Sequence, residues 1–212
     1  MSMQIRVLGA LEARVLAVLV EKQHTVPDSY PLSLNSLVSG CNQKTAREPV
    51  MSASDQDVLA VLADLKALHL VGEVSGARVV LFDHNMARVL KVPGQSVALL
   101  TLLILRGPQT AAELRLNTER LHKFADISSV EGFLDELAEQ GYAVKLPRAP
   151  GAREARWAHL LCGEVTHVQT TTVASEAVGE LVLLREDVAR LAQELSALRT
   201  EFNALKRELT GA

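Results

Sequence analysis

The chain has few of the residues that mark several common classes of protein. Aromatic residues make up only 3% of its 212 positions, so aliphatic side chains must fill most of its cores. Two cysteines, Cys41 and Cys162, lie far apart, which fits small buried thiols in a reducing compartment rather than a disulfide framework. The six histidines show no metal-ligand spacing, and we therefore expect no zinc site and no cofactor.

Membrane and enzyme signatures are also missing. The apolar run 97–105 is far too short to cross a bilayer, and no signal peptide is visible at residues 1–9. We therefore expect a cytoplasmic protein without a membrane partner. The sequence has no Walker loop, no Rossmann glycine pattern, no Gly-x-Ser-x-Gly elbow and no His-Glu-x-x-His, so we expect no enzymatic activity.

One helix pattern occurs twice, about seventy-two residues apart. Each copy has four apolar residues at positions i, i+3, i+4 and i+7, which places one apolar face on a helix. Each also has a preceding capping box, in which a hydroxyl and a carboxylate satisfy free amides. The stripes are Val58, Val61, Leu62, Leu65 and Val130, Phe133, Leu134, Leu137; the boxes are Ser54/Asp57 and Ser128/Glu131.

A hairpin follows each of these helices. The first joins the apolar runs 70–71 and 79–82 through Gly76-Ala77-Arg78, and the second joins runs 142–144 and 156–161 through Gly151-Ala152-Arg153. A helix followed by a hairpin with a basic tip is typical of the second half of a winged helix. The alternative is a generic small helical domain that happens to repeat a stripe.

The segments before the repeated helices agree with this interpretation. Residues 11–22 predict a first helix, and an apolar stripe after Ser33 predicts a second one. In the second copy, the run 97–105 is apolar nearly all round, so we expect it to be buried on more than one side. A stop signal at 106–108 follows, and Thr110 with Glu113 caps the next helix.

These patterns predict a mainly α protein with small β-hairpins. We expect two tandem winged-helix domains at residues 1–91 and 92–163, a linker at 164–178 and a coiled-coil helix at 179–212.

Charge argues against a dedicated DNA-binding protein. Residues 1–91 carry nine basic and nine acidic groups, residues 92–163 carry eight of each, and the net charge of -3 lies in the last segment. Both repeated helices are acidic on their polar faces, where carboxylates would repel a phosphate backbone. Basic residues occur elsewhere, on the two wings and on the connections between helices.

Nine residues are candidates for binding nucleic acid or a partner protein. They are Asn42, Gln43, Lys44, Arg47, Arg78, Arg115, Arg148, Arg153 and Arg156. Asn42 also suits the position after a helix, because asparagine tolerates the left-handed conformation. The alternative for the segment 42–47 is that its side chains tie the second helix to the third. For the arginines, the alternative is that they only keep exposed turns soluble.

Four stretches of the chain are distinctive: Glu21–Gln23, Tyr30–Ser33, Cys41–Lys44 and Arg47–Met51. They resemble the YceH family of uncharacterised bacterial proteins, together with Leu103, Leu105–Gly107, Thr110, Glu113–Arg115, Pro150, Gly151, Arg153 and Glu154. The resemblance covers roughly residues 8–162. It implies a tandem winged-helix fold and a cytoplasmic location, and it implies no activity.

The last segment has the heptad pattern of a coiled coil, with apolar residues spaced alternately by three and four. A parallel pair of helices would set Glu180, Glu194 and Glu201 against Arg185, Arg199 and Lys206 of a second chain, whereas an antiparallel pair would oppose like charges. We therefore expect a parallel homodimer; the alternative is a helix that folds back onto its own domains. The stripe is Leu181, Leu184, Val188, Leu191, Leu195, Leu198, Phe202, Leu205 and Leu209.

Two functions remain open. We expect a dimeric DNA-binding protein, a transcriptional or nucleoid-associated regulator, because the wings are basic and a dimer suits a two-fold operator. The alternative is an adaptor that binds proteins without direct DNA contact, which the acidic helices and the balanced charge favour.

The heptad pattern generates a test of assembly. We expect the full chain to be a dimer and a chain ending near Gly163 to be a monomer, because the apolar stripe and the charge pairs lie beyond that residue. Light scattering on both proteins measures their masses. Two monomers, or two dimers, would show that residues 179–212 do not join the chains.

Overall fold

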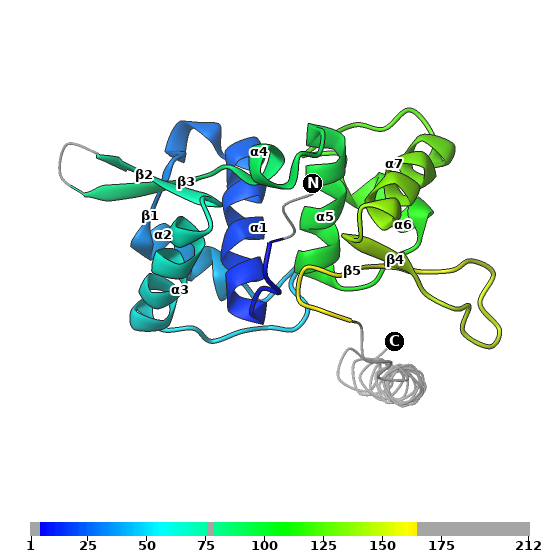
Figure 1. The fold of residues 1–212 in the computed structure, drawn as a ribbon, viewed down its shortest axis with the longest axis horizontal. Helices are drawn as coiled ribbons and strands as arrows, with labels where there is room; N and C mark the ends of the chain where they lie inside the picture. The colour runs from blue at the N-terminus through cyan, green and yellow to red at the C-terminus, as the bar shows by residue number, and fades with distance from the viewer. Residues whose placement is uncertain (1–4, 76–78, 165–212) are drawn as a thin grey trace, which may run out of the picture. The chain divides into compact units, whose positions relative to one another are not determined.

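The computed structural model describes residues 5–75 and 79–164, which lie within one compact unit. Within this part the chain is mainly helical with small antiparallel sheets, as the sequence predicts (Figure 1). The domain boundary expected at residue 91 falls between two helices of this unit.

The first half contains helices around a small three-stranded sheet of order β1-β3-β2, in which both strand pairs are antiparallel. Its last helix leads directly into the second half. In chain order the elements are α1 (Ala10–Thr25), the 3-10 helix η1 (Pro27–Ser29), β1 (Leu32–Ser33), α2 (Leu34–Cys41), α3 (Asp55–Ala67), β2 (Val71–Ser75), β3 (Val80–His84) and α4 (Met86–Leu90).

The second half repeats this order in a shorter form. Its elements are α5 (Gly94–Arg106), α6 (Ala111–Asn117), α7 (Ile127–Glu139), β4 (Ala143–Lys145) and β5 (Trp157–His159). Gln109, just before α6, pairs with Trp157: each amide donates to the carbonyl of the other, at 3.1 and 2.7 Å. In the first half β1, just before α2, pairs with β3 in the same way. The repeat seen in the sequence therefore extends to the strand pairing.

Helices α1 and α5 pack against each other and join the two halves (Figure 1). Every residue from Glu12 to Val20 and from Ser96 to Leu105 is buried. A helix that is buried all round needs neighbours on every side. For α1 these are α2, α3 and β3 of its own half and α5 of the other. The prediction that residues 97–105 are buried on more than one side is confirmed.

Backbone hydrogen bonds also connect the halves. The amide of Glu48, between α2 and α3, donates to the carbonyl of Leu105 at 2.7 Å, and the amide of Leu8 donates to the carbonyl of Leu161 at 2.8 Å. Because these groups are far apart in the sequence, each bond holds a loop of one half against the other.

The predicted helix starts are correct in two cases and wrong in one. Ser54 caps α3 together with Asp57, and Thr110 caps α6 together with Glu113, as expected. Helix α7 does not begin with the box predicted at Ser128. Its cap is Asp126, whose Oδ1 accepts from the amide of Ser129 at 2.7 Å. A carboxylate at this position satisfies the free amide and meets the positive end of the helix dipole, so the helix begins earlier than predicted.

Some predictions fall outside the described residues. They concern the first hairpin tip at 76–78, the linker at 164–178 beyond its first residue, and the coiled coil at 179–212. Within the described part, no helix combines the length and the apolar character needed to cross a membrane.

The contact between α1 and α5 predicts that the halves unfold together. We expect Leu16→Ala, in the first half, to lower the free energy of unfolding by about 2–5 kcal/mol, because it leaves a cavity at a fully buried site. Trp157, the single tryptophan, lies in the second half, so its fluorescence reports the unfolding of that half. In Leu16→Ala this fluorescence transition should shift to lower urea concentration. Leu59→Ala, at a half-exposed leucine of α3, is the control. An unchanged Trp157 transition in Leu16→Ala would mean that the halves unfold independently.

Candidate interaction surfaces

The connection between α2 and α3 is held by its own polar side chains. Asn42 ends α2, and its amide group makes two bonds to Ala53: Nδ2 donates to the carbonyl and Oδ1 accepts from the amide, both at 2.8 Å. Its φ of -91° is not left-handed, so the expected reason for an asparagine here is wrong. The side chain closes the loop instead, because its amide group pairs with the backbone of Ala53 as a neighbouring β-strand would.

Arg47 is buried in the same connection and uses all five of its N–H donors. Nε donates to the carbonyl of Gly40, and Nη1 donates to Glu21 and to the carbonyl of Ala46. Nη2 donates to Glu21 at 2.6 Å and to Gln43 at 2.7 Å. A guanidinium has five donors in all, so none is left for a ligand.

Glu21 is the acidic partner in this cluster. Burial works against its charge, but the hydrogen bonds and the positive charge of Arg47 outweigh that effect. They hold the pKa of the Glu21 carboxyl below its ordinary value of 4.5. Glu21 lies on α1, so the ion pair fixes the connection to the central helix.

A second arginine of α1 supports the same connection. Arg14 is only 1% exposed, and it donates to the carbonyls of Cys41 and Pro49 at 3.2 and 2.8 Å. Burial and the neighbouring charge of Arg47 lower the pKa of its guanidinium. Burial raises the pKa of the Cys41 thiol to about 11, which fits the inert buried cysteine expected from the sequence.

Most of the binding residues predicted in this segment have partners within the protein. Asn42, Arg47 and the Oε1 of Gln43 make internal hydrogen bonds, and Lys44 alone of the four is exposed. The alternative interpretation, that the segment ties α2 to α3, is the one that the hydrogen bonds support. Sequence reasoning missed Arg14; the available indication was an arginine directly beside the apolar run 15–20.

The four candidate arginines of the second half divide into two groups, one with partners inside the protein and one exposed. Arg115 donates to the carbonyl of Ala125 at 3.0 Å, and Arg156 donates to the carbonyl of Pro108 at 2.6 Å and to Glu113 at 3.1 Å. Arg148 and Arg153, on the loop between β4 and β5, are exposed. Among the described residues, the side-chain hydrogen bonds and ion pairs of that loop are made by Arg156, and none involves Arg148 or Arg153. Arg78 lies outside the described residues.

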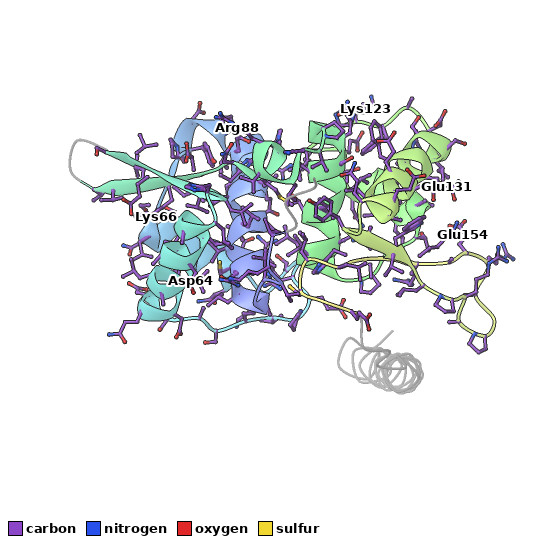
Figure 2. The ribbon with its side chains drawn as sticks, in the orientation of Figure 1. Asp64, Lys66, Arg88, Lys123, Glu131 and Glu154 are labelled. Atoms are coloured by element: carbon purple, nitrogen blue, oxygen red, sulfur yellow. The ribbon has the colours of Figure 1, made fainter. Side chains whose placement is uncertain are left out.

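The exposed faces of α3 and α7 are acidic, as the sequence predicts. On α7 the exposed carboxylates are Glu131, Asp135, Glu136 and Glu139, and the helix has no lysine or arginine. On α3 they are Asp55, Asp57 and Asp64. Figure 2 shows Asp64 and Lys66 on α3 and Glu131 on α7.

The outer surface of α3 is also partly apolar. Leu59 is 48% exposed, and Ala60, Ala63 and Ala67 are exposed beside it. The one cation of this helix, Lys66, is paired with Glu73 of β2. A surface of this kind, apolar with carboxylates at its margin, suits another protein better than a phosphate backbone.

No metal site is apparent in the described part of the chain, where histidine, cysteine and carboxylate side chains do not gather in groups of three or more.

The ion pair of the buried Arg47 with the partly buried Glu21 generates a stability prediction. We expect Arg47→Met to lower the free energy of unfolding by about 3 kcal/mol, because it leaves the Glu21 side chain, only 18% exposed, without its cation. Lys44→Met, which removes an exposed cation three residues away, should change it little. Urea unfolding at pH 7 measures both.

The same pair makes stability depend on pH. Because the folded pKa of Glu21 is depressed, its contribution is complete above the unfolded pKa and is lost as the pH falls through the folded one. The stability difference between the parent chain and Arg47→Met should therefore shrink between pH 7 and pH 3. A constant difference over this range would contradict the role given to Glu21.

Comparison with known proteins agrees with the distinctive motifs of the chain. The family described as "Protein of unknown function, DUF480" matches residues 8–152. A UPF0502 protein of Leptothrix cholodnii is 59% identical, with 96% of each chain covered. UPF0502 proteins of Cupriavidus necator and Methylibium petroleiphilum are 60% and 63% identical, over 92% and 90% of this chain and 84% and 85% of theirs. The chain therefore belongs to the DUF480 family, the YceH-like proteins that its motifs indicate.

Proposed function

We propose that this chain is a tandem winged-helix adaptor, a cytoplasmic protein that binds other proteins and has no enzymatic activity. Its C-terminal segment would add the parallel coiled coil that the heptads predict, and so would present two copies of the adaptor together.

The winged-helix assignment is supported by the order of elements in each half. A helix, a short extended segment, two further helices and a hairpin follow one another twice. In each half the extended segment pairs with the last strand of the hairpin. This is the arrangement in which the third helix and the hairpin of a winged helix present one binding surface. The third helices are α3 and α7.

The observation that carries the adaptor function is the charge of those third helices. In a DNA-binding winged helix the third helix enters the major groove, close to phosphates on both sides. Here α7 exposes four carboxylates and has no cation, and the single lysine of α3 is paired with Glu73. Carboxylates at such positions would be repelled by DNA, whereas a basic segment of another protein would be attracted.

DNA binding is the second candidate function, with a role in transcription or in the nucleoid. The specific observation that favours it is the pair of exposed arginines, Arg148 and Arg153, on the second hairpin loop. Lys44 adds an exposed cation in the first half. Contact with DNA would then come from a hairpin, with the third helices turned away from the groove.

The two functions differ in the effect of neutralising α7. The variant Glu131→Gln/Asp135→Asn/Glu139→Gln removes three carboxylates that lie one turn apart on the exposed face. If α7 faces DNA, duplex affinity at low salt should rise several-fold, because a repulsion is removed. The adaptor function predicts that the variant has the same DNA affinity as the parent chain. It also predicts that the variant no longer cross-links, in its own bacterium, to the proteins that cross-link to the parent chain. Fluorescence anisotropy and quantitative mass spectrometry measure these two outcomes.

A second triple variant is the control: Asp28→Asn/Glu119→Gln/Glu164→Gln neutralises three exposed carboxylates outside α7. It should keep the cross-linked proteins. If DNA affinity rises in the α7 variant and not in the control, the adaptor function is contradicted and α7 is the helix that contacts DNA. Equal loss of partners in both variants would show that net charge, rather than α7, attracts them.

A further inference from the structure

The hairpin of β4 and β5 has four basic residues, and two of them, Lys145 at the end of β4 and Arg156 just before β5, fix the base of its loop. Nζ of Lys145 lies 5.3 Å from the centre of the Trp157 ring, a cation–π contact. Arg156 donates to the carbonyl of Pro108 and pairs with Glu113 at 3.1 Å. The amide of Leu146 donates to the carbonyl of Arg156 at 2.8 Å, which closes the loop. The charge of the base is therefore used within the protein.

The tip of the loop is a tight turn. The amide of Ala152 donates to the carbonyl of Ala149 at 3.0 Å, and Gly151 has a φ of +82°. Proline at the second position and a left-handed glycine at the third are features of a type II turn. Arg148 directly precedes this turn and Arg153 directly follows it. The turn thus fixes the backbone positions from which two exposed arginine side chains extend.

The chemistry of the tip suits phosphate. A guanidinium presents its N–H donors in a planar fork that matches phosphate oxygens. The loop has no aromatic residue between positions 146 and 156, so it cannot stack on the bases of a single strand. Glu154 is exposed beside Arg153 and opposes binding of an anion (Figure 2). Two cations on a turn can position a protein on a backbone but offer little to read a base sequence.

We propose that residues 148–153, the tip of the second hairpin loop, bind the sugar-phosphate backbone of duplex DNA without reading its sequence. The inference rests on the second candidate function and names its contact element. It is compatible with the adaptor, because a protein that docks a partner on α7 can also hold DNA through this loop. Failure of the loop to bind would leave the test of α7 unaffected.

The experiment measures the affinity of the full chain for two labelled duplexes of unrelated sequence over a range of salt concentrations. Each phosphate contact adds close to one unit to the slope of log K against log salt. Arg148→Ala/Arg153→Ala should lower that slope by about two per chain and weaken binding at 0.1 M salt by on the order of tenfold or more, equally for both duplexes. Arg148→Lys/Arg153→Lys should keep most of the slope. Glu154→Gln should strengthen binding.

Arg88→Ala/Arg120→Ala is the matched control, since both arginines are exposed and lie outside the loop. It should leave the slope nearly unchanged. An equal fall in slope for this control would overturn the proposal, because the attraction would then belong to the whole surface. No salt-sensitive duplex binding by the parent chain, or a loss confined to one duplex, would overturn it too.

A last arm separates DNA from lipid phosphate. Vesicles containing phosphatidylserine carry the same anionic chemistry on a membrane. We expect them not to bind the parent chain at salt concentrations at which the duplex does. Vesicle binding that needs Arg148 and Arg153, without duplex binding, would assign the tip to a membrane surface and overturn the proposal.

Discussion

The packing of α1 against α5 is the constraint on which the rest of the structure depends. Each helix has an unbroken series of buried residues, Glu12–Val20 in α1 and Ser96–Leu105 in α5, and neither half alone supplies enough neighbours to cover it. Burial of this apolar surface is a large favourable term in folding, of roughly 25 cal/mol per Å². Two similar halves therefore form one compact unit, and the orientation of one hairpin is fixed relative to the other.

Buried charge has a structural role at the side of this core. Arg14 and Glu21 both lie on the central helix α1. Arg14 holds the connection between α2 and α3 directly through the carbonyl of Pro49, and Glu21 holds it through Arg47. Such a cluster adds little stability beyond what an apolar replacement would give, but it is costly to break. It also requires one arrangement of the connection, because five donors must find their acceptors at once. The segment that looks most like a binding motif is for this reason part of the framework.

With that segment assigned to the framework, the chemistry left on the surface is simple. The third helices present carboxylates and a few apolar side chains, and the second hairpin loop presents two arginines on a tight turn. Opposite charges on separate elements suit a protein that brings two different partners together. They suit less well a regulator that reads a base sequence, which needs donors and acceptors on a helix within the groove.

The sequence by itself determined the local elements: the apolar stripes of α3 and α7, the caps at Ser54 and Thr110, and the two hairpins. These depend on neighbours within one or two turns, which periodicity and capping rules describe. The cap at Asp126 was missed because Asp126 and Ser128, two positions apart, are both residue types that cap helices. Tertiary structure alone decided which of the basic side chains have partners inside the protein and which are exposed to solvent. Arg47 and Arg148 look alike in the sequence, but the first meets Glu21 across 26 residues and the second meets solvent. The reason is that a side chain's partners come from packing, and packing brings together residues that no local pattern connects.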